Sequence, residues 1–227
     1  ESCKKIAKWS RDGVEYEVKV DMRNVNSSHC PLPQENRHIV KDYSQIENPT
    51  SKDPNEIIGP AGSGPARIVS NDELFEYTVF FENMAEAGAP AARVRIDNPL
   101  DSNLRMASFR IKAFGFADTT FNFNEVPFIQ QNFELGSRYH GDLLRVVAGA
   151  DMERNKAFFE FTTIDPETRM LVTGTNNGFL LPNDSTGRGQ GFITYVIEPH
   201  KNLDAGTEIK NKAAIVFDGN EIIETNT

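Results

Sequence analysis

Apolar and polar side chains alternate along several short stretches of the chain. The clearest is 14–20 (Val-Glu-Tyr-Glu-Val-Lys-Val), where apolar residues occupy every second position. The stretch 74–81 is aromatic and β-branched, and 92–97 alternates valine and isoleucine with arginine. Because successive side chains of a strand point to opposite faces, this period of two predicts strands with one buried face. The charged stretch 92–97 suits the edge of a sheet.

Further short apolar runs follow, separated by residues that favour turns. Turn signals occur at Asn98-Pro99, Asp165-Pro166, Asn176-Asn177-Gly178 and Asp218-Gly219, where fixed φ, tolerated positive φ or side-chain-to-backbone bonds stabilise a bend. The additional strands expected between them are 108–114, 119–123, 143–147, 157–163, 192–197 and 213–217.

No stretch keeps a helical period over three turns. The nearest is 83–92, whose alanines are interrupted by Gly88 and Pro90. Many short strands without intervening helices predict an all-β antiparallel sandwich with Greek-key connections.

The N-terminal part of the chain differs in composition. Residues 24–65 are rich in Asn, Ser, Pro and Gly, with Cys30-Pro31-Leu32-Pro33 and Asn48-Pro49 as helix breakers. We therefore expect an extended N-terminal, strand-containing segment and linker over 1–48, and a β-sandwich module over 49–227.

Charge and composition limit the possible partners. The chain has 24 basic and 33 acidic residues, a net charge of −9, which repels nucleic acid. No apolar run is long enough to span a bilayer, and the start lacks the apolar segment of a signal peptide, so we expect that an export signal was removed or lies outside this sequence. Cys3 and Cys30 either form a disulfide in an oxidising compartment or are two unrelated thiols.

One hexapeptide occurs twice. Asp-Pro-Asn-Glu-Ile-Ile at 53–58 matches Asp-Gly-Asn-Glu-Ile-Ile at 218–223 in five of six positions. Carboxylate and amide oxygens suit Ca²⁺, and Asp97, Asp101 and Asp184 could add ligands from loops. Alternatively, the Asp and Asn side chains cap tight turns and the isoleucines begin a strand. The residues that would bind calcium are Asp53, Asn55, Glu56, Asp218, Asn220 and Glu221.

Four separated segments, 51–62, 77–83, 179–192 and 215–226, resemble a conserved repeat-type domain of very large exported surface proteins of Bacteroidetes and other bacteria. The resemblance extends over about 42–227. It implies an immunoglobulin-like β-sandwich and no established activity.

Catalytic motifs are not recognised in the sequence, since the histidines are isolated and no nucleophile elbow or Walker loop occurs. Glu160, between phenylalanines, is the best candidate for a carboxylate of a two-carboxylate hydrolase, although alternation places it on the outer face. Phe121 and Phe123 share one side of a strand, either as core or as a sugar-binding surface.

We therefore expect a noncatalytic structural or adhesive module of a secreted or cell-surface bacterial protein, with calcium at one end. Neighbouring modules of the same polypeptide are its expected partners, together with surface glycans or host cell-surface proteins, without nucleic acid or membrane insertion. The alternative function is a carbohydrate-binding module of a polysaccharide-processing protein.

Overall fold

The chain divides into two compact units, Glu1–Pro49 and Thr50–Thr227. The computed structural model describes residues 3–11, 14–22, 54–174 and 176–227, the first two ranges by their backbone alone. In the first unit, β1 (Cys3–Arg11) and β2 (Val14–Met22) pair as an antiparallel hairpin. The strand expected at 14–20 is therefore present. Residue 30 lies outside the described residues, so both alternatives for Cys3 and Cys30, a disulfide or two unrelated thiols, stay open.

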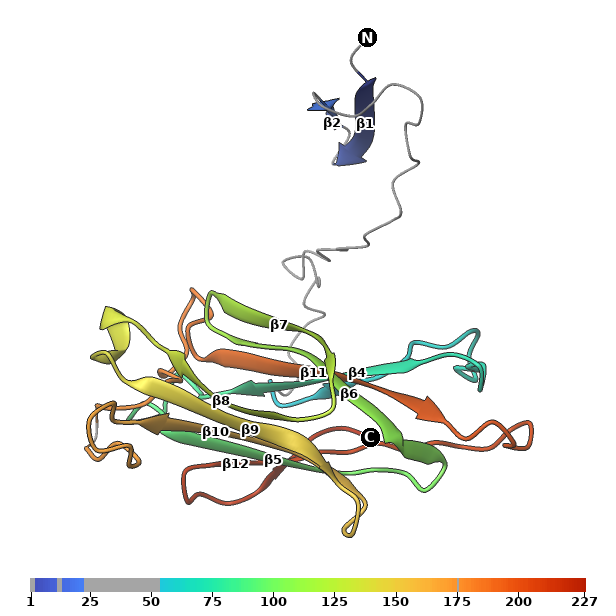
Figure 1. Ribbon diagram of the computed structural model, residues 1–227. Helices are drawn as coiled ribbons and strands as arrows, with labels where there is room; N and C mark the ends of the chain where they lie inside the picture. The colour runs from blue at the N-terminus through green and yellow to red at the C-terminus, as the bar shows by residue number, and fades with distance from the viewer. Residues whose placement is uncertain (1–2, 12–13, 23–53, 175) are drawn as a thin grey trace. The chain divides into compact units, whose positions relative to one another are not determined.

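The second unit consists of two antiparallel sheets packed face to face (Figure 1). The six-stranded sheet has the order β13 (Ile223–Glu224), β12 (Ala214–Phe217), β5 (Arg93–Pro99), β10 (Lys156–Ile164), β9 (Leu143–Asp151) and β8 (Ile129–Glu134). The five-stranded sheet has the order β3 (Ile57–Ile58), β4 (Phe75–Glu82), β11 (Gln190–Pro199), β6 (Leu104–Phe116) and β7 (Thr119–Val126). The predicted all-β antiparallel sandwich is confirmed.

Several connections between consecutive strands cross from one sheet to the other. The chain changes sheet between β4 and β5, between β5 and β6, between β7 and β8, and twice more around β11. A short 3₁₀ turn, η2 (Ser137–Tyr139), precedes β9. Within the residues that the structure describes, no helix is long and apolar enough to cross a membrane.

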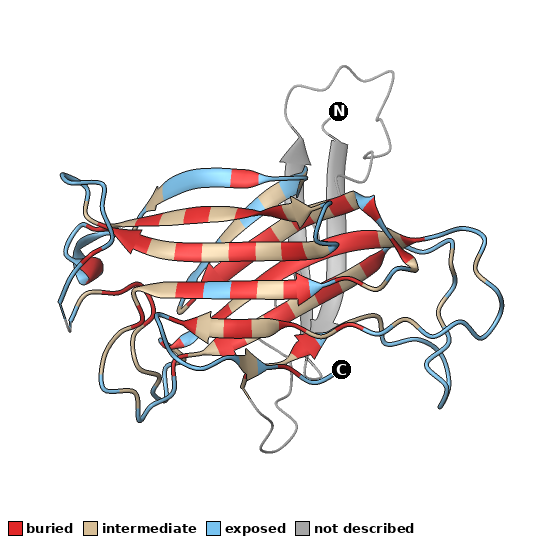
Figure 2. Ribbon diagram, turned by 90° about the horizontal axis from the view of Figure 1, so that it is seen from below, coloured by how far each residue is buried: buried red, intermediate tan, exposed pale blue. Residues whose placement is uncertain are grey.

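Phenylalanine rings fill the space between the sheets. Burial alternates residue by residue along β4, as Figure 2 shows for many of the strands, so that every second side chain faces inward. Phe114 lies at the centre of one cluster, with its ring 4.8 Å from Phe121, 5.2 Å from Phe133 and 5.4 Å from Phe161. Burial of this apolar area is the main driving force for folding.

The prediction that 92–97 forms a sheet edge is wrong. β5 lies inside the six-stranded sheet, between β12 and β10. Val94 and Ile96 are fully buried, whereas Arg93 points to the outer face and forms an ion pair with Glu160 at 2.8 Å. The arginines of this strand are compatible with a central position because Arg93 pairs with Glu160 of β10 and Arg95 pairs with Asp97 of β5 itself.

Asn98 and Pro99 belong to β5, so the turn predicted at this position is wrong too. Asn98 is fully buried. It has the same parity along the strand as Val94 and Ile96, which places its side chain on the inner face, where an amide must find hydrogen-bond partners.

A closed triangle of hydrogen bonds satisfies this amide. Tyr195 on β11 donates its hydroxyl hydrogen to Asn98 Oδ1 at 2.5 Å, and Asn98 Nδ2 donates to Asn211 Oδ1 at 2.5 Å. Asn211 Nδ2 completes the triangle by donating to the Tyr195 hydroxyl oxygen at 2.7 Å. The triangle therefore joins the five-stranded sheet to the six-stranded sheet and to the segment before β12.

Aromatic rings enclose the triangle. The Tyr195 ring lies 5.2 Å from Phe109, 5.5 Å from Tyr77 and 5.8 Å from Phe159. Burial raises the pKa of Tyr195 far above its ordinary value, and burial together with the charge of Asp101 raises the pKa of Tyr77 to about 12. Both hydroxyls are therefore neutral at physiological pH, and the Tyr195 hydroxyl keeps the hydrogen that it donates to Asn98.

We expect Tyr195→Phe to lower the free energy of unfolding by about 1–3 kcal/mol, because it leaves the amides of Asn98 and Asn211 buried without their hydroxyl partner. Asn211→Ala should cost a similar amount. Urea denaturation of both single variants and the double variant would measure their coupling. Strictly additive losses would show that the triangle does not act as a unit.

Candidate functional site

The segments that enter and leave the sandwich are joined by one asparagine side chain. Ile57 N–H donates to Asn226 Oδ1 at 2.7 Å, and Asn226 Nδ2 donates to Ile57 C=O at 3.1 Å. The amide thus occupies both backbone groups of one β3 residue, as a neighbouring strand would. We call this pair of hydrogen bonds the Asn226 clasp.

The exit segment is fixed on the other side as well. Thr225 is buried, its N–H donates to Ala213 C=O at 2.9 Å, and its Oγ1 accepts from Ala213 N–H at 3.0 Å. β13 itself pairs with β12. The Asn226 clasp therefore connects an edge of the five-stranded sheet to an edge of the six-stranded sheet.

The first copy of the repeated hexapeptide holds the entry strand in place. Asn55 is buried, and its Oδ1 accepts the N–H of Glu82 at 3.2 Å. Glu56 C=O accepts the N–H of Phe80 at 2.8 Å. Asp53 lies outside the described residues. The described part of this copy fastens β3 to the end of β4.

The second copy forms a turn. Asp218 adopts a left-handed φ of 53°, and its Oδ1 accepts Arg93 N–H at 2.8 Å and Ala92 N–H at 3.1 Å. Asn220 and Glu221 are exposed, and Asn220 N–H donates to Phe217 C=O. The Asp218 carboxylate therefore holds the end of β12 against the start of β5.

Both copies lie at the same end of the sandwich. Asn55 contacts the last residue of β4, Asp218 contacts the start of β5, and a single loop over 83–92 joins these two strands. Across the described residues, no group of three or more acidic, histidine or cysteine side chains could hold a metal ion. Because Asp53 lies outside that part of the chain, the calcium site stays a prediction.

Aspartates in other loops stabilise turns. Asp165 Oδ1 accepts N–H groups from Glu167 and Thr168 at 2.9 and 2.6 Å. Asp184 Oδ1 accepts the Thr186 hydroxyl and backbone N–H, and these hydrogen bonds, the hydroxyl first, lower the pKa of Asp184. These carboxylates replace missing backbone partners in bends.

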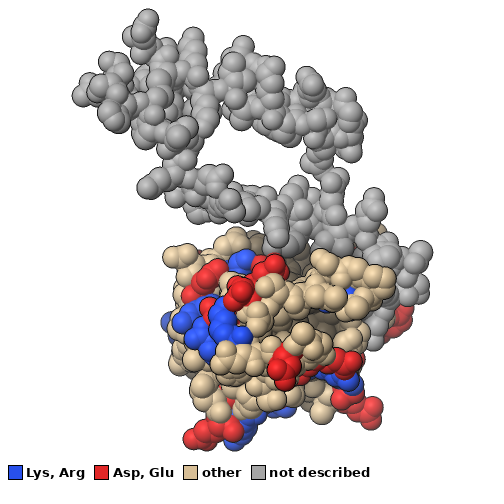
Figure 3. Space-filling view, turned by 90° about the vertical axis from the view of Figure 1, so that its right-hand side faces the viewer, with Lys and Arg blue, Asp and Glu red and all other residues tan. Residues whose placement is uncertain are grey.

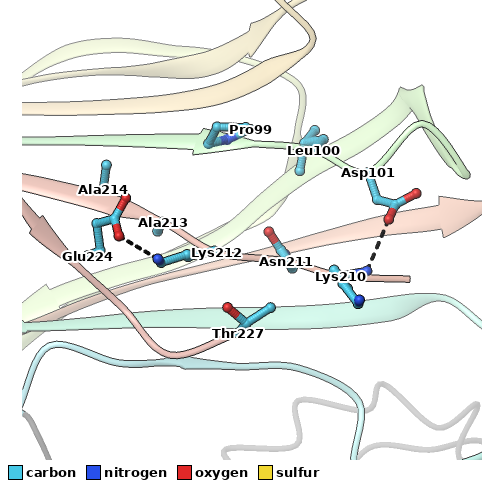
Figure 4. A pocket seen from close by; sticks show the side chains of 10 residues that line it. All are labelled: Pro99, Leu100, Asp101, Lys210, Asn211, Lys212, Ala213, Ala214, Glu224 and Thr227. Carbon is cyan, nitrogen blue, oxygen red and sulfur yellow. Dashed lines mark hydrogen bonds and ion pairs between the residues drawn. The ribbon is translucent and has the colours of Figure 1, made fainter. Parts of the chain in front are cut away.

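An open groove of about 320 Å³ lies where the chain ends (Figure 4). Pro99, Leu100 and Ala213 supply apolar surface, while Asp101 Oδ2 accepts the backbone N–H of Lys210 at 3.0 Å. Lys212 forms an ion pair with Glu224. Lys212 and Glu224 therefore neutralise each other, whereas the Asp101 carboxylate is used to hold the backbone of Lys210.

Acidic and basic side chains are interspersed on the face seen in Figure 3. Asp97 on β5 takes part in two ion pairs. Its Oδ1 lies 2.6 Å from Nζ of Lys156 on β10, and its Oδ2 lies 3.4 Å from Nε of Arg95 on β5 itself. Partly exposed pairs of this kind contribute little to stability, but they prevent a surface patch of one sign.

The two remaining candidate features are structural in the described sandwich. Glu160 lies on the outer face, as alternation predicted, in its ion pair with Arg93. Phe121 and Phe123 face the core, where they contact Phe114 and Phe133. Phe121 and Phe123 therefore form no aromatic platform on the outer surface of β7.

Sequence comparison relates part of this chain to a family. A family described as a domain of unknown function (DUF7619) matches residues 151–227, which comprise the last residue of β9 and all of β10 to β13. The match covers less than half of the chain. No curated protein matches the sequence.

The solved structures that are similar to the chain include a pilin and a collagen-binding domain. The full-length major pilin SpaD from Corynebacterium diphtheriae has a TM-score of 0.38 and 15% identity, over 67% of this chain and 30% of that chain. The collagen-binding domain from a Staphylococcus aureus adhesin has a TM-score of 0.37 and 11% identity, over 78% of this chain and 96% of that chain. This chain thus spans under a third of the pilin.

We expect Asn226→Ala to lower the free energy of unfolding by about 1–2 kcal/mol, because it removes two hydrogen bonds from Ile57. Asn220→Ala, measured with a chelator present, is the matched control. Its side chain is exposed, so its effect should stay within about 0.5 kcal/mol. Equal losses in the two variants by urea denaturation would contradict a role for the clasp.

Proposed function

We propose that this chain is a noncatalytic structural or adhesive module of a multidomain bacterial surface protein, stabilised by calcium at one end. Its partners are neighbouring modules of the same polypeptide, with host cell-surface proteins as ligands. The extracellular location rests on the resemblance to domains of large exported surface proteins.

The Asn226 clasp is the observation that carries the proposal. A module in a series must transmit load between the segments where the chain enters and leaves. Here Ile57 and Asn226 belong to these two segments and bind each other directly. Each segment is also held by its own sheet, through Phe80 on one side and Ala213 on the other. Load on either end of the sandwich therefore reaches the same small group of hydrogen bonds.

The calcium part of the proposal rests on oxygen-rich side chains at the same end of the sandwich. Asn220 and Glu221 are exposed, and Asp218 accepts its backbone donors through Oδ1. A hard cation takes carboxylate and amide oxygens of this kind. The described residues alone supply fewer ligands than calcium requires, so Asp53 would have to contribute.

Pulling the full chain by its two ends in a single-molecule experiment tests the load-bearing role. We expect Asn226→Ala to unfold at lower force than the unmodified chain, because unfolding under load depends on the contacts broken first. With a chelator present, so that the proposed calcium ligands play no part, Asn220→Ala should unfold at the unmodified force. An unfolding force that is insensitive to Asn226 would remove the main support for the module.

Calcium and sugar can be tested together with the full chain. We expect added Ca²⁺ to raise the melting temperature with concentration by mass action, and a chelator to reverse the shift. Glu221→Gln should weaken the shift. The unmodified chain should bind no sugar on a glycan array with calcium or with chelator. No shift would refute the calcium site, and sugar binding would favour a carbohydrate-binding module.

A further inference from the structure

Four strands end the two sheets of the described sandwich, and three of them are protected against pairing with another chain. Open strand edges expose backbone donors and acceptors, and proteins usually protect them by shortness, bulges, proline or lysine. β3 and β13 contain two residues each, and the Asn226 clasp also occupies Ile57 on β3.

β7 is protected by an irregularity. Its pairing with β6 shifts between Ile111↔Val126 and Ala113↔Asn122. Glu125, within the shifted part, has a φ of 51°. A bulge of this kind bends the strand and interrupts the row of outward-facing backbone groups.

β8 has none of these protections. Its six residues pair with β9 in one unbroken register, from Ile129↔Ala148 to Glu134↔Leu143. Its sequence, Ile-Gln-Gln-Asn-Phe-Glu, contains neither lysine nor proline. Gln130, Gln131 and Asn132 are exposed.

The pairing with β9 shows which backbone groups face away from the sheet. Leu135 N–H donates to Asp142 C=O at 3.2 Å, just beyond the strand. In an antiparallel pair, alternate residues bond to the partner and the others face outward. Gln130, Asn132 and Glu134 therefore present their N–H and C=O groups at the open edge.

We propose that β8 pairs antiparallel with β8 of a second copy of this chain, with a twofold axis at Asn132. In this register Asn132 faces its own counterpart, and Gln130 faces Glu134 of the other copy. Every residue in these pairs is one whose N–H and C=O groups lie at the open edge, so the backbones of the two copies can form hydrogen bonds with each other. The two six-stranded sheets would become one continuous sheet.

The side chains of β8 favour a second copy as the occupant. The twofold register places Ile129 opposite Leu135 on the inner face, so these two apolar side chains gain an apolar neighbour, and it places Gln131 opposite Phe133. Glu134 faces Gln130, so no two acidic side chains lie directly opposite each other. Two like charges in that position would destabilise the pairing of the strands. The same patch serves both copies, as an isologous interface requires.

The charge of the chain predicts how this association depends on salt. Two copies with a net charge of −9 each repel one another at a distance. Salt screens that repulsion, whereas the backbone hydrogen bonds are uncharged. The dimer should therefore become tighter as salt concentration rises.

Sedimentation velocity of the full chain over a range of concentrations, at low and high salt, tests the proposal. We expect a monomer–dimer equilibrium that shifts toward dimer with salt. Asn132→Pro should weaken dimerisation about tenfold or more, because it removes the central outward N–H. That N–H does not bond to β9, and proline is tolerated where an edge-strand N–H faces solvent.

Lysine variants supply a matched comparison. Asn132→Lys places a protecting charge on β8 and should abolish the dimer, whereas Asn122→Lys makes the same change on β7 and should leave it intact. Melting temperatures at low protein concentration check that each variant folds. If Asn132→Pro has a lowered melting temperature, the comparison of Asn132→Lys with Asn122→Lys decides the result.

Two results would overturn the proposal. One is a dimer that persists in Asn132→Lys or is lost in Asn122→Lys. The other is a chain that stays monomeric at every concentration and salt, which would leave a strand of a different protein as the occupant of the β8 edge.

Discussion

The sandwich depends on one buried polar constraint, the hydrogen-bonded triangle of Tyr195, Asn98 and Asn211. Apolar burial brings two sheets together but does not specify how they align, since hydrophobic attraction is not directional. Three buried polar side chains that must all form hydrogen bonds with one another permit few alignments of the two sheets. The triangle draws one residue from each sheet and one from the connection before β12. The aromatic rings around Tyr195 exclude water from these hydrogen bonds.

The same need for backbone and side-chain partners explains the edges of the sandwich. At the edge where the chain enters and leaves, the amide of Asn226 bonds to Ile57 and takes the place of an adjacent strand. At the opposite edge, β7 is bulged while β8 is regular and lacks protecting residues. One side of the domain is therefore closed by its own chain, and the other offers backbone groups to a second chain.

The loops follow a related rule. Asp165, Asp184 and Asp218 each direct a carboxylate oxygen at N–H groups in a bend. Such oxygens resemble metal ligands in the sequence because calcium sites and capped turns use the same residue types. The repeated hexapeptide shows this overlap: Asp218 holds a turn, while Asn220 and Glu221 remain exposed.

Alternation of apolar and polar residues was sufficient to predict the sandwich and most of its longer strands, because side-chain direction in a strand has a fixed period. It did not predict β8, whose run of amides has no such period and which is a strand because β9 lies beside it. Asn98 looked like a turn residue, and only the packing of the two sheets shows it as an inner-face amide. The Asn226 clasp joins positions separated by 169 residues. Partnerships over such a distance are decided by tertiary structure, because local pattern carries no information about which strands become neighbours.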